Sequence, residues 1–143
     1  MRLKNYTQVD TEWLRAAIRE VKPANVTSFD ISIKNSSRGN RGTAYWNGCS
    51  YHATSAPLIT IGLSMKTKFP YRTVEGGGYL GVTLYTLKEV ALFIIAHELR
   101  HLWQAKVKRG WRVWGARGQF SERDADAYAL QMLRKYRRGE LAA

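Results

Sequence analysis

The stretch that decides the fold lies at residues 86–101, which read TLKEVALFIIAHELRH. Seven consecutive apolar residues, VALFIIA, cover every side of a helix, which predicts a helix whose first half is buried. Thr86 and Glu89 fit a capping box at its start. The spacing therefore predicts a long central helix that ends near residue 107.

This helix carries a metal-binding pattern, His97-Glu98-Leu99-Arg100-His101, which is an H-E-x-x-H motif. Histidines four residues apart lie on one face of a helix, so both imidazoles can reach one metal ion. The glutamate between them can reach a water on that metal. Zinc in a hydrolytic site usually has three protein ligands. The third ligand must therefore come from elsewhere in the chain.

A second cluster, ERDAD, follows at residues 122–126. Ser121 fits the N-cap of a final helix over about residues 122–138. Glu122 is the best candidate for the third ligand. Asp126 lies one turn further on the same face and can accept a hydrogen bond from a ligand histidine. H-E-x-x-H alone is a short motif, and the second cluster strengthens the prediction of a Zn²⁺ site.

Together, H-E-x-x-H and E-x-x-A-D resemble the motifs of the gluzincin metallopeptidases. The similarity is to the HtpX and CAAX-prenyl-protease type and to small soluble relatives. It implies that His97, His101 and Glu122 bind zinc. It also implies that Glu98 is the general base of peptide-bond hydrolysis and that Asp126 supports a ligand from behind.

The resemblance covers about residues 86–133. The membrane helices of the family are absent, and Arg100 stands where the family often has a glycine. Repressor-cleaving zincins of phages and bacteria also pair H-E-x-x-H with a downstream glutamate and are a second possible relative. The resemblance implies a soluble zinc metalloendopeptidase that acts on a protein or peptide substrate.

The remaining sequence predicts an α+β fold in one domain, residues 1–143. Asp10 fits the N-cap of a first helix at residues 10–21. Alternating or continuous apolar patterns predict strands at residues 26–33, 43–46, 57–63 and 79–83. This order is typical of a small, mainly antiparallel sheet packed on helices. With the resemblance, it predicts a zincin-like arrangement whose C-terminal helix carries the third ligand.

The sequence offers more than one candidate for the groups that would contact a substrate. Tyr128, His52 and Arg123 are candidates for the donor that stabilises an oxyanion. In zincins, a strand at the sheet edge holds the extended substrate, and residues 57–63 or 79–83 fit that role.

Composition and charge bear on location and partners. The single cysteine, Cys49, excludes an intrachain disulfide, and the N-terminus lacks the apolar core of a signal peptide. No apolar run is long enough to span a bilayer. We expect a soluble, cytoplasmic protein.

The net charge is +12, and residues 100–138 hold eleven Lys or Arg against three acidic residues. This segment can attract nucleic acid or an acidic partner, and Trp111 and Trp114 lie within it. An alternative function is therefore that of a basic nucleic-acid-binding protein with a structural or degenerate zinc site, or of a peptidase recruited to nucleic acid. The basic residues also fit a solvated surface without a partner, and the two tryptophans also fit a flap that packs over the core.

Overall fold

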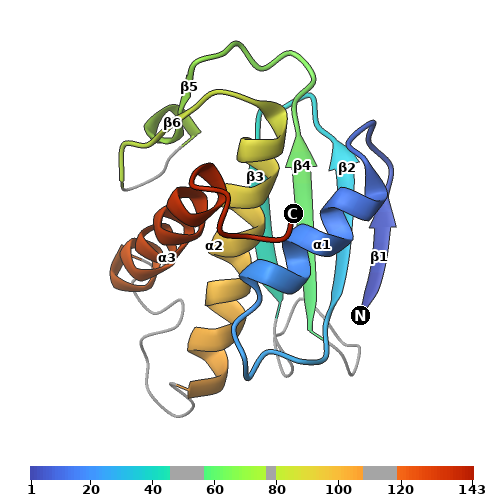
Figure 1. Ribbon diagram of the computed structural model, residues 1–143, viewed down its shortest axis with the longest axis vertical. Helices are drawn as coiled ribbons and strands as arrows, with labels where there is room; N and C mark the ends of the chain where they lie inside the picture. Colours follow the sequence, from blue (N-terminus) through green and yellow to red (C-terminus); the bar gives the residue numbers. More distant parts are fainter. Residues whose placement is uncertain (46–56, 77–79, 108–118) are drawn as a thin grey trace.

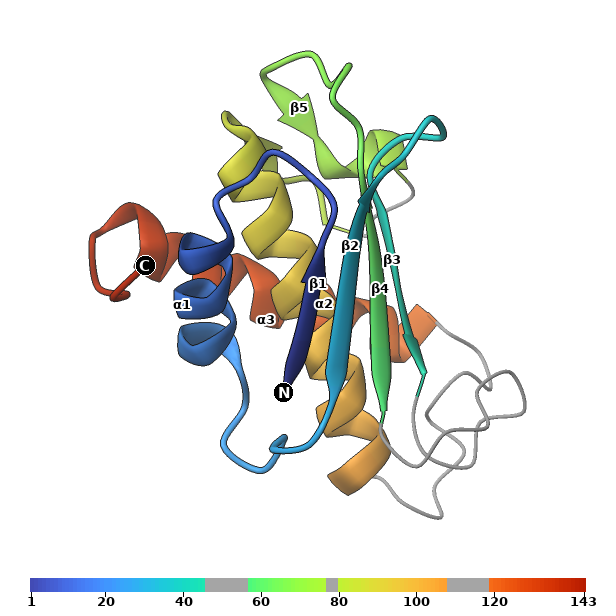
Figure 2. The same cartoon turned by 90° about the vertical axis from the view of Figure 1, so that its right-hand side faces the viewer.

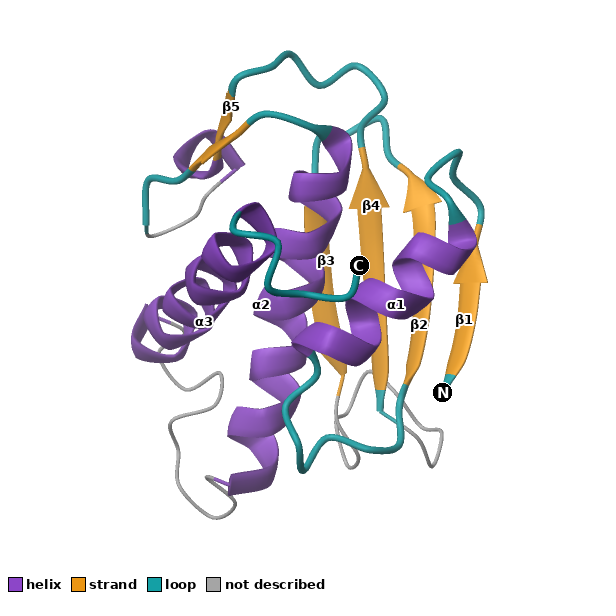
Figure 3. Ribbon diagram, in the orientation of Figure 1, coloured by secondary structure: helices purple, strands orange, loops and turns teal. Residues whose placement is uncertain are grey.

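A computed structural model describes residues 1–45, 57–76, 80–107 and 119–143 (Figure 1). Its elements in chain order are β1 (Arg2–Asn5), α1 (Thr11–Val21), β2 (Asp30–Asn35), β3 (Arg41–Tyr45), β4 (Leu58–Leu63), β5 (Tyr71–Arg72), the 3₁₀ helix η1 (Thr73–Gly76), β6 (Thr83–Leu84), α2 (Leu87–Val107) and α3 (Gln119–Arg137). The predicted α+β class is confirmed (Figure 3).

The main sheet has the strand order β1-β2-β4-β3. β1 and β4 each pair with β2 in parallel, and β3 pairs with β4 antiparallel. The main sheet is therefore mixed, and the prediction of a mainly antiparallel sheet is wrong. The physical reason is that α1 connects β1 to β2, and a crossover of this length lets consecutive strands run in the same direction. A second sheet consists of the short antiparallel pair β5 and β6.

Helices α1 and α2 lie on one side of the main sheet (Figure 2), and α2 packs against β3, β4, α1 and α3. The apolar residues of β2 and β4 alternate, so one face of each strand is buried. The buried strand residues are Ile31, Ile33, Ile59, Ile61 and Leu63. This alternation confirms the prediction of half-buried strands here, although β2 begins at Asp30 rather than at residue 26.

The long central helix is confirmed as α2, and six of its seven apolar residues before His97 are buried. The Thr86 hydroxyl accepts a hydrogen bond from the Glu89 backbone N–H at 3.1 Å. The Glu89 carboxylate accepts one from Tyr85 N at 2.8 Å and also pairs with Arg137 at 2.9 Å. The start of α2 is thereby tied to the end of α3.

Other boundaries differ from the sequence-based expectations. The predicted strand at 79–83 is reduced to β6, and residues 77–79 lie outside the described part of the chain. Helix α3 begins at Gln119, so Ser121 lies within it and is not its N-cap. Among the described residues, no helix has the length and apolar character needed to span a membrane.

Candidate metal centre

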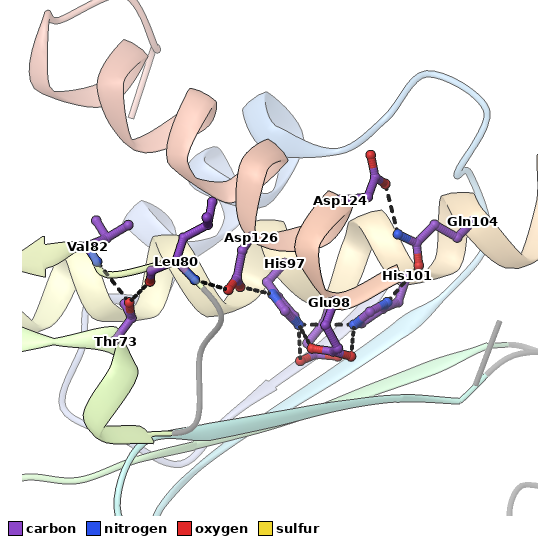
Figure 4. Close-up of polar contacts among 10 residues, drawn as sticks. Thr73, Leu80, Val82, His97, Glu98, His101, Gln104, Asp124 and Asp126 are labelled. Atoms are coloured by element: carbon purple, nitrogen blue, oxygen red, sulfur yellow. Dashed lines mark hydrogen bonds and ion pairs between the residues drawn. The ribbon is translucent and has the colours of Figure 1, made fainter. Parts of the chain in front are cut away.

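The two histidines of the H-E-x-x-H motif lie side by side on α2 (Figure 4). Their ring centroids are 4.6 Å apart, and their Nε2 atoms are 3.0 Å apart. His101 is buried and the His97 side chain is 14% exposed. The four-residue spacing therefore brings the two Nε2 atoms to one point, as the sequence predicts.

Glu122 reaches this point from α3. One carboxylate oxygen lies 3.0 Å from His97 Nε2, and the other lies 2.8 Å from His101 Nε2. The face of α3 that packs on the rest of the protein includes Ala125 and Ala129, both fully buried. Small side chains there allow α3 to approach α2 closely. The packing of the two helices thus places Glu122 over both histidines.

Asp126 lies behind His97, as predicted. One of its carboxylate oxygens is 2.7 Å from His97 Nδ1, and the other accepts a hydrogen bond from Leu80 N at 3.1 Å. The Leu80 carbonyl accepts from the Thr73 hydroxyl at 2.5 Å, and that hydroxyl accepts from Val82 N at 3.0 Å. The side chain behind the first histidine is therefore connected to the segment between η1 and β6 (Figure 4).

Glu98 is buried between α2 and the sheet, with a carboxylate oxygen 3.8 Å from His97 Nε2. This is farther than Glu122 lies from either histidine. Burial raises the pKa of the Glu98 carboxyl, against the lowering effect of the two histidines. Gly42 of β3 faces this side chain, and a Cβ there would come within 2.9 Å of Glu98 Cγ. The absence of a side chain at residue 42 leaves the room that Glu98 occupies.

Sequence reasoning missed the group behind His101. His101 Nδ1 lies 2.8 Å from the Gln104 side-chain oxygen, and the Gln104 amide nitrogen donates to Asp124 at 2.8 Å. Gln104 is 3% exposed although it is polar. The sequence contained one signal for this contact, because His101 and Gln104 are three residues apart and therefore share a face of the helix.

The donor set suits a metal ion. His97, Glu98 and His101 each offer a ligand atom, all within 4.8 Å of one another. Zinc–ligand bonds of about 2.0–2.1 Å in a tetrahedron place neighbouring donors about 3.3 Å apart. The 2.8–3.0 Å separations among the Nε2 atoms and the Glu122 oxygens come close to this value. The residues present could therefore hold a metal ion.

The charges at the site also favour a cation. Burial lowers the pKa of His97, but hydrogen bonds to Asp126 and Glu122 outweigh burial and raise the pKa to about 10. Burial raises the pKa of Glu122, but its hydrogen bonds to His101 and His97 outweigh burial and lower the pKa. Asp126 and Glu122 thus favour the protonated form of His97. A metal ion that binds there would displace this proton.

Of the candidates for the oxyanion donor, the structure describes Tyr128 and Arg123. The Tyr128 hydroxyl donates to the Val21 carbonyl at 2.5 Å, and Arg123 is exposed. His52, Trp111 and Trp114 lie outside the described residues, as do residues 108–118 of the basic segment.

The strands expected to hold a substrate also differ from the prediction. The predicted strand at 57–63 is the interior strand β4 (Leu58–Leu63), flanked by β2 and β3. Its apolar residues are buried, and β4 packs against α2. β6 pairs with β5 and not with the main sheet. Neither predicted segment therefore offers a free edge of the main sheet.

Comparison with models of protein families, with curated proteins and with solved structures finds no match for this chain.

Proposed function

We propose that this chain is a zinc-dependent endopeptidase of the gluzincin type. The observation that carries the proposal is the convergence of His97, His101 and Glu122. The two Nε2 atoms lie 3.0 Å apart, and each lies within 3.0 Å of a Glu122 oxygen. A zincin-like fold is part of the proposal. It is supported by the packing of α2 against β3 and by the position of Glu122 on the final helix.

In this proposal, His97, His101 and Glu122 are the residues that would hold the zinc ion. Zinc bound there would lower the pKa of a water molecule to about 7 and polarise a substrate carbonyl. Glu98 would act as the general base, accepting a proton from a water molecule and passing it to the leaving amine. The buried position of Glu98 beside the histidines supports this division of roles, because Glu122 lies closer to both Nε2 atoms.

The edge strand β3 supports a peptide as the substrate. β3 lies at one end of the main sheet, and an edge strand has main-chain groups that can pair with an extended peptide. Gly42, the second residue of β3, faces Glu98. A peptide added to β3 would therefore pass close to the proposed general base.

The proposal is tested with zinc analysis and a peptide library read by mass spectrometry. We expect about one zinc ion per chain and cleavage of library peptides by the wild-type protein. Glu98→Gln should retain zinc and lose at least about 100-fold in rate, since general-base catalysis contributes 10²–10⁴-fold. His97→Ala should lose zinc.

Glu12→Gln is the matched control, because Glu12 lies on α1 with its side chain 85% exposed. Its zinc content and cleavage rate should equal those of the wild type. A wild-type protein that binds no zinc, or a Glu98→Gln variant as active as Glu12→Gln, would refute the proposal.

A further inference from the structure

A chain of three side chains stands behind His101. The Arg100 guanidinium donates to both oxygens of Asp124, at 2.7 and 3.1 Å. Asp124 accepts from the Gln104 amide at 2.8 Å, and the Gln104 oxygen lies 2.8 Å from His101 Nδ1. The chain therefore connects a charged residue inside the H-E-x-x-H motif to one of the proposed metal ligands.

The first member of this chain is held in place by aromatic rings. The Arg100 guanidinium carbon lies 3.6 Å from the centre of the Trp103 ring and 5.2 Å from that of Tyr128. Stacking on an aromatic face orients the planar guanidinium. Its bidentate contact in turn fixes the position of the Asp124 carboxylate.

The ionised Asp124 side chain sets the direction of the hydrogen bonds that connect Arg100 to His101. An ionised carboxylate only accepts hydrogen bonds, so the Gln104 group that faces it must be the amide NH₂. The Gln104 oxygen then faces His101 and can only accept. His101 Nδ1 must therefore carry a proton. With a metal ion bound at the point where Nε2 lies 2.8 Å from a Glu122 oxygen, the lone pair of Nε2 would then be available to that ion.

We propose that Gln104 is a positioning residue, held by Asp124 and Arg100, that fixes His101 in the tautomer required for metal binding. The inference rests on the proposed zinc site and adds to it a residue for which the sequence motif has no place. It also gives Arg100 a role at the position where related motifs often have glycine. Outer hydrogen bonds of this kind contribute about 10–100-fold to metal affinity.

The test measures zinc affinity by competition with a chromogenic chelator, without reference to hydrolysis. Gln104→Met keeps the length of the side chain and removes both hydrogen bonds. We expect its dissociation constant for zinc to rise about 10–100-fold. Gln131→Met is the matched control, since Gln131 is exposed on α3, and its affinity should equal that of the wild type.

A double variant that exchanges the amide of Gln104 and the carboxylate of Asp124 tells an effect of hydrogen-bond direction from an effect of packing. Gln104→Glu alone places two carboxylates against each other and should weaken zinc binding. Adding Asp124→Asn restores an NH₂ donor between them, so that residue 104 again accepts from His101 Nδ1. The double variant should recover most of the zinc affinity that Gln104→Glu loses. Asp124→Asn alone should weaken zinc binding less than Gln104→Glu alone.

A spectroscopic measurement reads the tautomer directly. In zinc-loaded protein with ¹⁵N-labelled histidine, we expect the proton of His101 on Nδ1 in the wild type and in the double variant. In Gln104→Met, that proton should exchange faster with water, because its acceptor is gone.

The outcomes distinguish the two proposals. If the wild type binds zinc and Gln104→Met binds it equally well, the role of Gln104 is refuted and the zinc site stands. A folded double variant that stays as weak as Gln104→Glu would also refute that role. If zinc binding depends on Gln104 but no peptide is cleaved, the peptidase proposal fails and the positioning role stands. A wild type that binds no zinc overturns both.

Discussion

A methyl group added at Gly42 tests the contact between the edge strand and Glu98. In Gly42→Ala, the new Cβ would lie 2.7 Å from Ile94 Cγ2 and 2.9 Å from both Cγ and a carboxylate oxygen of Glu98. Carbon atoms in contact lie about 3.5 Å apart or more. Ile94 must therefore retreat by about 0.8 Å and Glu98 by about 0.6 Å.

These displacements set the expected magnitudes. Overpacking of this kind costs about 1–3 kcal/mol of folding free energy, or about 3 °C in Tm for each kcal/mol in a chain of this size. Catalytic groups must be held within about 0.5 Å of the productive geometry, and a 1 Å misplacement costs about 100-fold in rate. We expect kcat for peptide cleavage to fall about 10–100-fold.

Gly62→Ala on β4 is the matched control. Its Cβ would lie 2.9 Å from Ser36 Cβ and 3.3 Å from Arg41 Cγ, and none of its close neighbours belongs to the metal centre. Both variants should lose stability in thermal unfolding and bind zinc like the wild type. Only Gly42→Ala should lose kcat, measured well below the Tm of either variant. Equal loss of kcat in both variants, or an unchanged kcat in Gly42→Ala, would refute the reasoning.

Three further outcomes are expected. The pKa of Glu89 is lowered, first by its hydrogen bond to Arg137, so this pair stabilises the fold above the ordinary pKa of about 4.5 and loses its effect as pH falls below it. Glu89→Gln should therefore cost about 1–2 kcal/mol at pH 7 in urea unfolding and much less near pH 3; an equal cost at both pH values would contradict this. Zinc at 100 times its dissociation constant should add about 2.7 kcal/mol to the unfolding free energy, and a chelator should remove this gain in a thermal shift assay; His97→Ala should show no gain. Asp10→Ala removes the N-cap of α1, whose carboxylate accepts a hydrogen bond from Trp13 N at 2.8 Å, and should lower the unfolding free energy by about 1 kcal/mol. Its zinc affinity should equal that of the wild type, and a changed affinity would contradict this expectation.

The helices could be predicted because their signals are local. Three signals depend only on neighbouring residues: the cap at Asp10, the capping pattern at Thr86, and Gly139, which follows the end of α3 with φ at +71°. The pairing of the strands could not be predicted in the same way. β1 has one apolar residue, Leu3, and lies at a sheet edge, so its sequence has no alternating pattern to detect. Without β1, the parallel connection through α1 was hidden.

The proposed ligands were also predictable, because the spacing of His97 and His101 on a helix fixes where their rings lie. The distance from Glu122 to these rings depends on how α3 packs on α2, which is a property of the tertiary structure. Gln104 was missed for a different reason. A glutamine has no motif of its own, and its role depends on a partner twenty residues later, Asp124.

The Asp126 carboxylate is shared between the side chain of His97 and the main chain at Leu80, 46 residues earlier in the sequence. Exchange of the Leu80 amide hydrogen with deuterium requires this bond to open. An ion that fixes His97 also restrains Asp126, so occupancy of the centre becomes visible as slower deuterium uptake in a segment that contributes no ligand. Deuterium exchange at the Leu80 amide, measured by mass spectrometry, can therefore detect an ion bound at the centre without substrate or dye.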